Sequence, residues 1–416
     1  MFPWQEILQL VIGGVVAVYL QPMFWLLFGL IGYQYWKLQK SQRQMLGVDT
    51  FSLPQQVTMT AFWGSVGGGI GSFLLTVMGV NLSQLGLAYI WPVAIVLMVI
   101  NTRYLCFAYA GGLVALSKVL FGWPNVDVPQ VLVLVAILHI TESLLIVISG
   151  SYGNMPVILR REDGRLVGAF KLQNFWPLPL VLMSAVAVPD SQLSSSMLSM
   201  PDWWPLLPVV QTAPEGYQWM YSMIPVVAAL GYTDLAIVSS PQMRRRKSAM
   251  HLAIYSVVLL GLALLSVEYK WLQLIAALLS PLGHELFIQV DSRQEFEGEP
   301  RYVPSLQGVM ILDTVIDSPA YKAGLKTGDI LLNLHGLLVD SPSQLAATLA
   351  TVPEKFTVEL LRNGRTKTCK IRLEKSKTVL GVILVPSGEE LHYIELVEDK
   401  FLLWESFKRL LRKNKA

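Results

Sequence analysis

A succession of apolar segments, most of them close to the length of a membrane-spanning helix, fills the first 290 residues of the chain. A helix needs about 20 apolar residues to cross the hydrocarbon core of a bilayer. Hydrophobic residues make up 53% of the 416 residues, and the mean hydropathy is +0.49. We therefore expect residues 1–290 to form a polytopic α-helical membrane domain with about 8–10 spans. The clearer predicted spans are 58–79, 85–100, 104–121, 129–148, 177–189, 218–238, 250–267 and 271–290.

The first apolar run, residues 7–36, allows two interpretations, because Gln21 and Pro22 interrupt it. One long tilted helix would have to tolerate a proline in its interior. Two short helices folded as a hairpin would each fall short of a full crossing. The residues alone leave both arrangements open.

Basic residues gather in alternate loops of the predicted spans, which indicates an orientation. If the loop after the first run is cytoplasmic, so is the C-terminal part of the chain, and the acidic loop 190–217 lies outside. The basic run 244–247 fits a topology determinant better than an anionic-lipid site. The basic residues placed inside are Lys37, Lys40, Arg43, Arg103, Arg160, Arg161, Arg165, Lys171, Arg244, Arg245, Arg246 and Lys247, against Lys118 and Lys270 outside.

Two segments within the membrane domain have their own patterns. The small-residue run 64–72 contains five glycines and predicts close packing against a neighbouring helix rather than a ligand site. Residues 155–172 alternate around a Glu-Asp-Gly-Arg turn and predict a small cytoplasmic β-hairpin.

A different pattern begins near residue 291, where charged residues become frequent. Ser318 and Pro319 suit the first positions of a one-turn helix, which Gly324 would end in a left-handed conformation. A strand at 330–334, a helix from Ser341 and a hairpin around Asn363-Gly364 should follow. Residues 317–331 resemble the bacterial PDZ pattern S-P-A-x-x-A-G-L-x-x-G-D-x-[IL]. We therefore expect a small α+β PDZ domain over 291–376, on the cytoplasmic side.

The PDZ resemblance implies a peptide-binding site. Such domains bind an extended peptide as an added strand beside a helix, and backbone amides receive a carboxylate. The expected added strand lies along 309–313, although Gln307 stands where the family usually has a hydrophobic residue. The expected peptide-binding residues are Leu306, Gln307, Gly308, Val309, Met310, Ile311, Leu345 and Leu349.

The remaining residues, 377–416, predict a strand pair around 386–388 and a basic amphipathic tail over 401–413. This tail could lie on the inner leaflet or dock on the PDZ domain. The two cysteines, Cys106 and Cys369, cannot form a disulfide framework.

Ionisable residues within predicted spans are candidates for function. His139 and Glu142 share a helix face, and His284-Glu285 ends the last span. A site-2-type intramembrane metalloprotease would need H-E-x-x-H, but Ile288 occupies the position of the second histidine. We expect these pairs to fix helix packing, and we expect no catalytic residue, metal or cofactor.

A polytopic membrane block followed by one PDZ domain is similar to the MinJ family of division-site determinants in Gram-positive rods. The resemblance implies a non-enzymatic adaptor that links the polar protein DivIVA to the membrane-associated ATPase MinD. It also implies that both termini are cytoplasmic, which favours the hairpin form of 7–36. The alternatives are an active or degenerate intramembrane protease and a transporter or secretion component. Partners would be lipids and division proteins, with no nucleic acid; the oligomeric state stays open.

Overall fold

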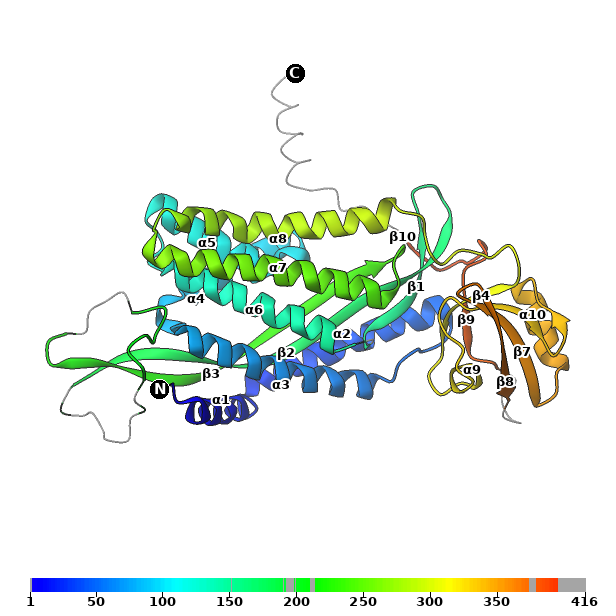
Figure 1. Ribbon diagram of the computed structural model, residues 1–416, viewed down its shortest axis with the longest axis horizontal. Coiled ribbons are helices and arrows are strands. Elements are labelled where there is room, and N and C mark those ends of the chain that lie inside the picture. Colours follow the sequence, from blue (N-terminus) through cyan, green and yellow to red (C-terminus); the bar gives the residue numbers. More distant parts are fainter. Residues whose placement is uncertain are drawn as a thin grey trace, which may run out of the picture.

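The computed structural model describes residues 2–150, 152–189, 191, 198, 200–209, 214–373 and 379–395. Helices and one very long β-hairpin lie along a common axis, and a small mixed domain sits at one end of that axis, as Figure 1 shows. We call this end the PDZ end and the opposite end, where the hairpin turns, the tip end. The helices of the membrane block are α1 (Trp4–Val18), α2 (Pro22–Leu46), α3 (Leu53–Met78), α4 (Leu87–Ile100), α5 (Phe107–Phe121), α6 (Val128–Ile148), α7 (Pro241–Glu268) and α8 (Leu272–Glu297).

Four described helices are long and apolar enough to cross a bilayer, namely α3, α6, α7 and α8. The pair α1 and α2 meets the same test together, with a bend of 69° at the break between them. Helices α4 and α5, of 14 and 15 residues, are too short to cross alone. The described residues therefore hold up to five helical crossings rather than the 8–10 predicted.

The two halves of the first apolar run do not fold back on each other. Phe2 stacks on Trp203 at the tip end, with ring centroids 5.6 Å apart. The far end of α2 reaches the PDZ end, where the Ile158 amide lies 3.2 Å from the sulfur of Met45. The run is one bent path, in contrast to the hairpin that the family resemblance favoured.

Two segments that the sequence predicted as membrane-spanning helices are β-strands. Residues 177–189 and 218–238 lie mostly in strands β2 (Leu166–Pro189) and β3 (Tyr217–Ala236), which pair antiparallel from Phe170↔Ala236 to Pro189↔Tyr217. A buried strand and a buried helix both read as a continuous apolar run. Pro177 and Pro179 disfavour a helix interior, because a proline removes a backbone hydrogen bond and clashes with the preceding turn.

The glycine run of α3 packs closely against two neighbouring elements. The sequence predicted close packing against a helix, but only one of the two neighbours, α6, is a helix, and the other is strand β2. A side chain at Gly64 or Gly68 would meet the carbonyl oxygen of Pro177 or Pro179 in β2, at 2.2 and 2.5 Å. A Cβ at Gly67 would lie 2.7 Å from Cδ1 of Leu145 in α6. The absence of side chains therefore allows β2 to lie directly on α3, where Ser72 Oγ accepts a hydrogen bond from the Val181 amide.

The PDZ domain is confirmed, and its motif works as predicted. The Ser318 side chain caps α9 (Pro319–Lys322) by accepting from the Tyr321 amide, and Asn363 and Gly364 turn the hairpin with positive φ. The strands are β4 (Val309–Thr314), β5 (Ile330–Leu334), β6 (Leu337–Leu338), β7 (Lys355–Arg362), β8 (Arg365–Arg372) and β9 (Val382–Leu384), with α10 (Pro342–Thr351) between β6 and β7. The sheet runs in the order β8-β7-β5-β4-β9.

The C-terminal strands do not pair with each other, contrary to the predicted strand pair. Strand β9 joins the PDZ sheet beside β4, so the domain extends past residue 376. Strand β10 (Ile394–Glu395) instead pairs parallel with β1 (Asn154–Arg160), which forms the predicted hairpin with the start of β2. The predicted tail over 401–413 lies outside the described residues.

Candidate functional site: a docked PDZ domain and a polar cluster between helices

The predicted peptide-binding residues surround strand β4 but differ in exposure. Leu306 and Gln307 are exposed, whereas Val309 and Ile311 are buried in the PDZ core. Leu345 of α10 belongs to that core, and the remaining predicted residues, Gly308, Met310 and Leu349, are buried or partly buried. The structure brings the set together around β4 and α10.

The edge of β4 on which a peptide was expected is already taken. Strand β5 pairs with one side of β4, and β9 pairs with the other through Ile311↔Leu384 and Thr314↔Val382. A peptide added along 309–313 would have to displace β9. Among the described strands, β9 ends the sheet order on this side, so its outer edge takes the place that the sequence assigned to β4.

The backbone N–H and C=O groups of successive β9 residues point alternately toward β4 and away from it. The Val385 amide donates to the Met310 carbonyl, and the Gly381 carbonyl accepts from the Val315 amide, so these groups face β4. Alternation along a strand points the amides of Val382 and Leu384 away from β4. Gly381 has φ +76°, and a side chain there would meet Ser318 Cβ at 2.2 Å. Glycine thus lets the chain enter β9 closely packed against the start of α9.

A buried ion pair holds the motif loop of the PDZ domain. Arg362 contacts both carboxylate oxygens of Asp329, at 2.7 and 2.6 Å, and also donates to the Gly324 carbonyl. Nearby, burial raises the pKa of the Asp313 carboxyl to about 6, although bonds from the Thr314 amide and the Thr327 hydroxyl partly oppose the shift.

The PDZ domain is docked on the membrane block rather than suspended from it. The Gly168 amide of β2 donates to the Tyr302 carbonyl, and Leu312 of β4 packs against Gly168. Ile383 and Val385 belong to the same buried cluster as Phe170 of β2. This contact places the edge strand β9 next to the base of the β1–β2 hairpin.

Two arginines of the basic run 244–247 are internal, which differs from a free lipid-binding patch. Arg244 and Arg245 are 2% and 3% exposed. Arg244 pairs with Asp234 of β3 at 2.8 Å and donates to the Asp291 carbonyl of α8. Arg245 donates to Asn154 of β1. Together they connect α7, α8 and the base of the hairpin.

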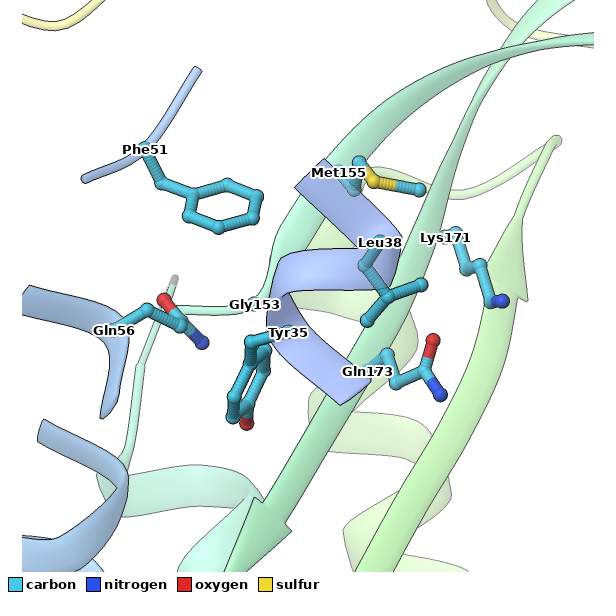
Figure 2. Close-up of a pocket in the computed structure, with 8 residues that line it drawn as sticks. All are labelled: Tyr35, Leu38, Phe51, Gln56, Gly153, Met155, Lys171 and Gln173. Atoms are coloured by element: carbon cyan, nitrogen blue, oxygen red, sulfur yellow. The ribbon is translucent and has the colours of Figure 1, made fainter. Parts of the chain in front are cut away.

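A small recess lies at the same end, between α2, α3 and the β1–β2 hairpin, as Figure 2 shows. It has room for about one water molecule. The lining residues are Tyr35, Leu38, Phe51, Gln56, Gly153, Met155, Lys171 and Gln173.

The ionisable residues of the spans form one cluster near the middle of α6 and α8. Glu285 accepts hydrogen bonds from Arg103, from the Tyr109 hydroxyl at 2.6 Å and from Gln289 at 2.8 Å. Arg103 therefore pairs with α8 at the turn between α4 and α5, whereas the sequence predicted it in a cytoplasmic loop. Packing of these polar pairs between helices agrees with the expectation.

The sequence reasoning missed Cys106. Its sulfur lies 3.0 Å from Nε2 of His139 and 3.8 Å from Nε2 of His284. The signal in the sequence was a break in the apolar pattern at Asn101-Thr102-Arg103, just before this cysteine. Such a break indicates a turn within the membrane domain, where polar groups can meet those of other helices.

No protein-family model matches the chain. The cell division topological determinant MinJ of Bacillus subtilis is 26% identical over 268 residues, which cover 63% of this chain and 63% of MinJ. The chain thus aligns with somewhat less than two thirds of that relative.

Shorter similarities concern proteases and a solved PDZ domain. The serine protease Do-like HtrA of Bacillus subtilis is 39% identical over 74 residues, or 17% of this chain and 16% of HtrA. The periplasmic serine endoprotease DegP of Escherichia coli is 33% identical over 76 residues, or 18% of this chain and 16% of DegP. The PDZ domain of an SdrC-like protein from Listeria monocytogenes is 17% identical, covers 19% of this chain and 90% of that chain, and has a TM-score of 0.17. The protease similarities cover only PDZ-like segments.

Proposed function

We propose that this protein is a membrane scaffold that recruits protein partners through its PDZ domain during division-site selection. The observation that carries the proposal is the position of β9, an edge strand docked beside the membrane block. Strand addition to such an edge uses main-chain hydrogen bonds for affinity and neighbouring pockets for specificity.

The division role rests on the similarity to MinJ, which is named as a topological determinant of cell division. We propose that the PDZ end faces the cytoplasm, since basic residues concentrate there. A scaffold of this kind would bridge a DivIVA-like polar protein and a MinD-like ATPase. The alternative function, a site-2-type protease, is disfavoured. Glu285 already accepts three hydrogen bonds and is not free to act as a base.

The test changes the outer edge of β9 without removing its bonds to β4. Leu384→Pro deletes one outward amide, and prolines are tolerated on edge strands. We expect the full-length variant to insert and fold normally, but to lose its partners in a crosslinking pulldown from native membranes. Lys355→Pro is the matched control, because it introduces a proline at the start of β7, a strand remote from β9.

Two outcomes would count against the proposal. Normal partner recovery with Leu384→Pro would place recruitment elsewhere than at the β9 edge. Recovery of a cleaved substrate, in place of intact division proteins, would favour the protease alternative over the scaffold.

A further inference from the structure

Three side chains with metal-binding atoms converge inside the membrane block, independently of the PDZ function. Cys106 precedes α5, His139 lies midway along α6, and His284 lies midway along α8. Their sulfur and nitrogen atoms all lie within 4.8 Å of one another. The three residues belong to separate parts of the chain: His139 lies 33 positions after Cys106, and His284 lies 178 positions after it.

The orientation of His139 suits a metal ligand. Its Nδ1 lies 2.7 Å from the carbonyl oxygen of Val135, which can only accept, so the ring carries its proton there. The other nitrogen, Nε2, therefore presents a lone pair toward the sulfur of Cys106. A hydrogen bond from the second ring nitrogen to a backbone carbonyl is a common way to orient histidine ligands.

His284 supplies the second imidazole. Its Nε2 faces Cys106, while its Nδ1 is buried and has no hydrogen-bond partner in the described structure. The ring is bordered by Tyr109 and Tyr255, with centroids 5.3 and 5.7 Å away. An apolar, aromatic wall of this kind excludes water and fixes the ring.

The turn that carries Cys106 is held in place by polar contacts with α8. Arg103 and Tyr109, on either side of the cysteine, both bind Glu285. Ser280 Oγ donates to the Ala108 carbonyl at 2.8 Å. The position of the sulfur relative to the two histidines is therefore fixed by the packing of α5 on α8.

We propose that Cys106, His139 and His284 bind one Zn²⁺ ion between the membrane helices. Zinc binds thiolate sulfur at about 2.3 Å and imidazole nitrogen at about 2.0 Å in a tetrahedron, which sets the sulfur-to-nitrogen separation at about 3.6 Å. The observed 3.0 and 3.8 Å bracket this value, so small side-chain shifts suffice. One thiolate and two neutral imidazoles also match the ligand preference of zinc.

The three side chains leave the fourth coordination position of a tetrahedral zinc ion available. A zinc ion with one thiolate and two neutral imidazoles keeps one net positive charge, which is costly in a membrane interior and which an anionic fourth ligand would balance.

The experiment measures metal in the intact full-length protein. We expect protein purified in mild detergent without chelators to contain about one zinc per chain by elemental analysis, a stoichiometry typical of sites with this ligand set. Replacement of the metal by Co²⁺ should give a thiolate-to-cobalt charge-transfer band. Cys106→Ala should abolish both signals, while Cys369→Ala, which changes the other cysteine in PDZ strand β8, should leave both unchanged.

A thiol-labelling measurement on the wild-type protein avoids dependence on the folding of variants. A membrane-permeant maleimide should label Cys369 but not Cys106 until a strong chelator removes the metal. The proposal is overturned if native protein contains no zinc and takes up no Co²⁺, if its metal content survives Cys106→Ala, if copper occupies the site instead, or if chelation leaves Cys106 labelling unchanged.

Discussion

The ring of Tyr302, at the start of the PDZ domain, packs edge-on against Phe170 of β2, with centroids 5.4 Å apart. Tyr302 is 1% exposed, and its carbonyl accepts a hydrogen bond from Gly168. The contact ties the PDZ domain to the β-hairpin of the membrane block.

Tyr302→Ala should loosen this docking without unfolding either part. Loss of the aromatic pair and its burial should make protease cleavage near residues 299–303 roughly tenfold faster, which corresponds to about 1.4 kcal/mol. Limited proteolysis of the full-length protein in detergent measures the rate. Tyr321→Ala, which changes a tyrosine that is 52% exposed on the PDZ surface, is the control. Equal rates in both variants would mean that this contact does not hold the domain.

Gly68→Ala should destabilise the membrane block, because the new Cβ would lie 2.5 Å from the Pro179 carbonyl oxygen in β2. Overpacking against backbone costs about 1–3 kcal/mol. Gly69→Ala, at the next position, meets nothing within 4 Å and should be neutral or slightly stabilising, since alanine favours helix. Thermal unfolding of both variants in detergent makes the comparison. A tolerated Gly68→Ala would contradict the close packing of α3 on β2.

Arg362→Ala should destabilise the PDZ domain by about 3 kcal/mol, because it leaves the carboxylate of Asp329 buried without its partner. Asp329 is 1% exposed and receives two contacts from this arginine. Arg365→Ala at the exposed hairpin turn should change stability by less than about 0.5 kcal/mol. Denaturant unfolding of a fragment spanning 300–395 provides the measurement. Similar midpoints for the two variants would show that the ion pair adds little.

The stability of the same fragment should depend on Asp313. Burial raises the pKa of this carboxyl from 3.8 to about 6, so the folded state favours the protonated form. The stabilisation is therefore fully present below about pH 4 and is lost as the pH rises through about 6. Asp313→Asn should remove this dependence and be more stable than the wild type at pH 7, by about 3 kcal/mol. A wild-type fragment whose unfolding free energy is constant between pH 4 and 7 would refute the shift.

The bent path of α1 and α2 predicts that the two ends of the chain lie on opposite sides of the membrane. A reporter after Ala416 should be active only in the cytoplasm, and an epitope near Ser195, which lies outside the described residues, should be accessible only outside. An epitope at the N-terminus should also be accessible outside. Cytoplasmic N-terminal and C-terminal reporters together would instead support the hairpin form of residues 7–36.

Local sequence patterns determined the elements whose structure depends on short-range physics. Ser318 and Pro319 start α9, and Asn363-Gly364 turns the β7–β8 hairpin, because each depends on backbone preferences within a few residues. The apolar runs likewise predicted helices α3, α6, α7 and α8, which are long and apolar enough to cross a bilayer. They did not distinguish a strand from a helix at 177–189, since a continuous apolar run lacks the periodicity that separates the two.

Only the tertiary structure decided which distant segments meet. Strand β9 occupies the edge of β4 through backbone hydrogen bonds to Met310 and Val315. These residues lie about 70 positions from β9 in the chain, so no local pattern encodes the pairing. Cys106, His139 and His284 lie far apart in the sequence, and their ligand atoms converge only when α5, α6 and α8 pack together. Backbone propensity acts within a segment, whereas the order of strands and the convergence of ligand atoms arise from the packing of whole elements. The sequence therefore identified the PDZ domain. Only the tertiary structure located the free edge of that domain and the buried cluster.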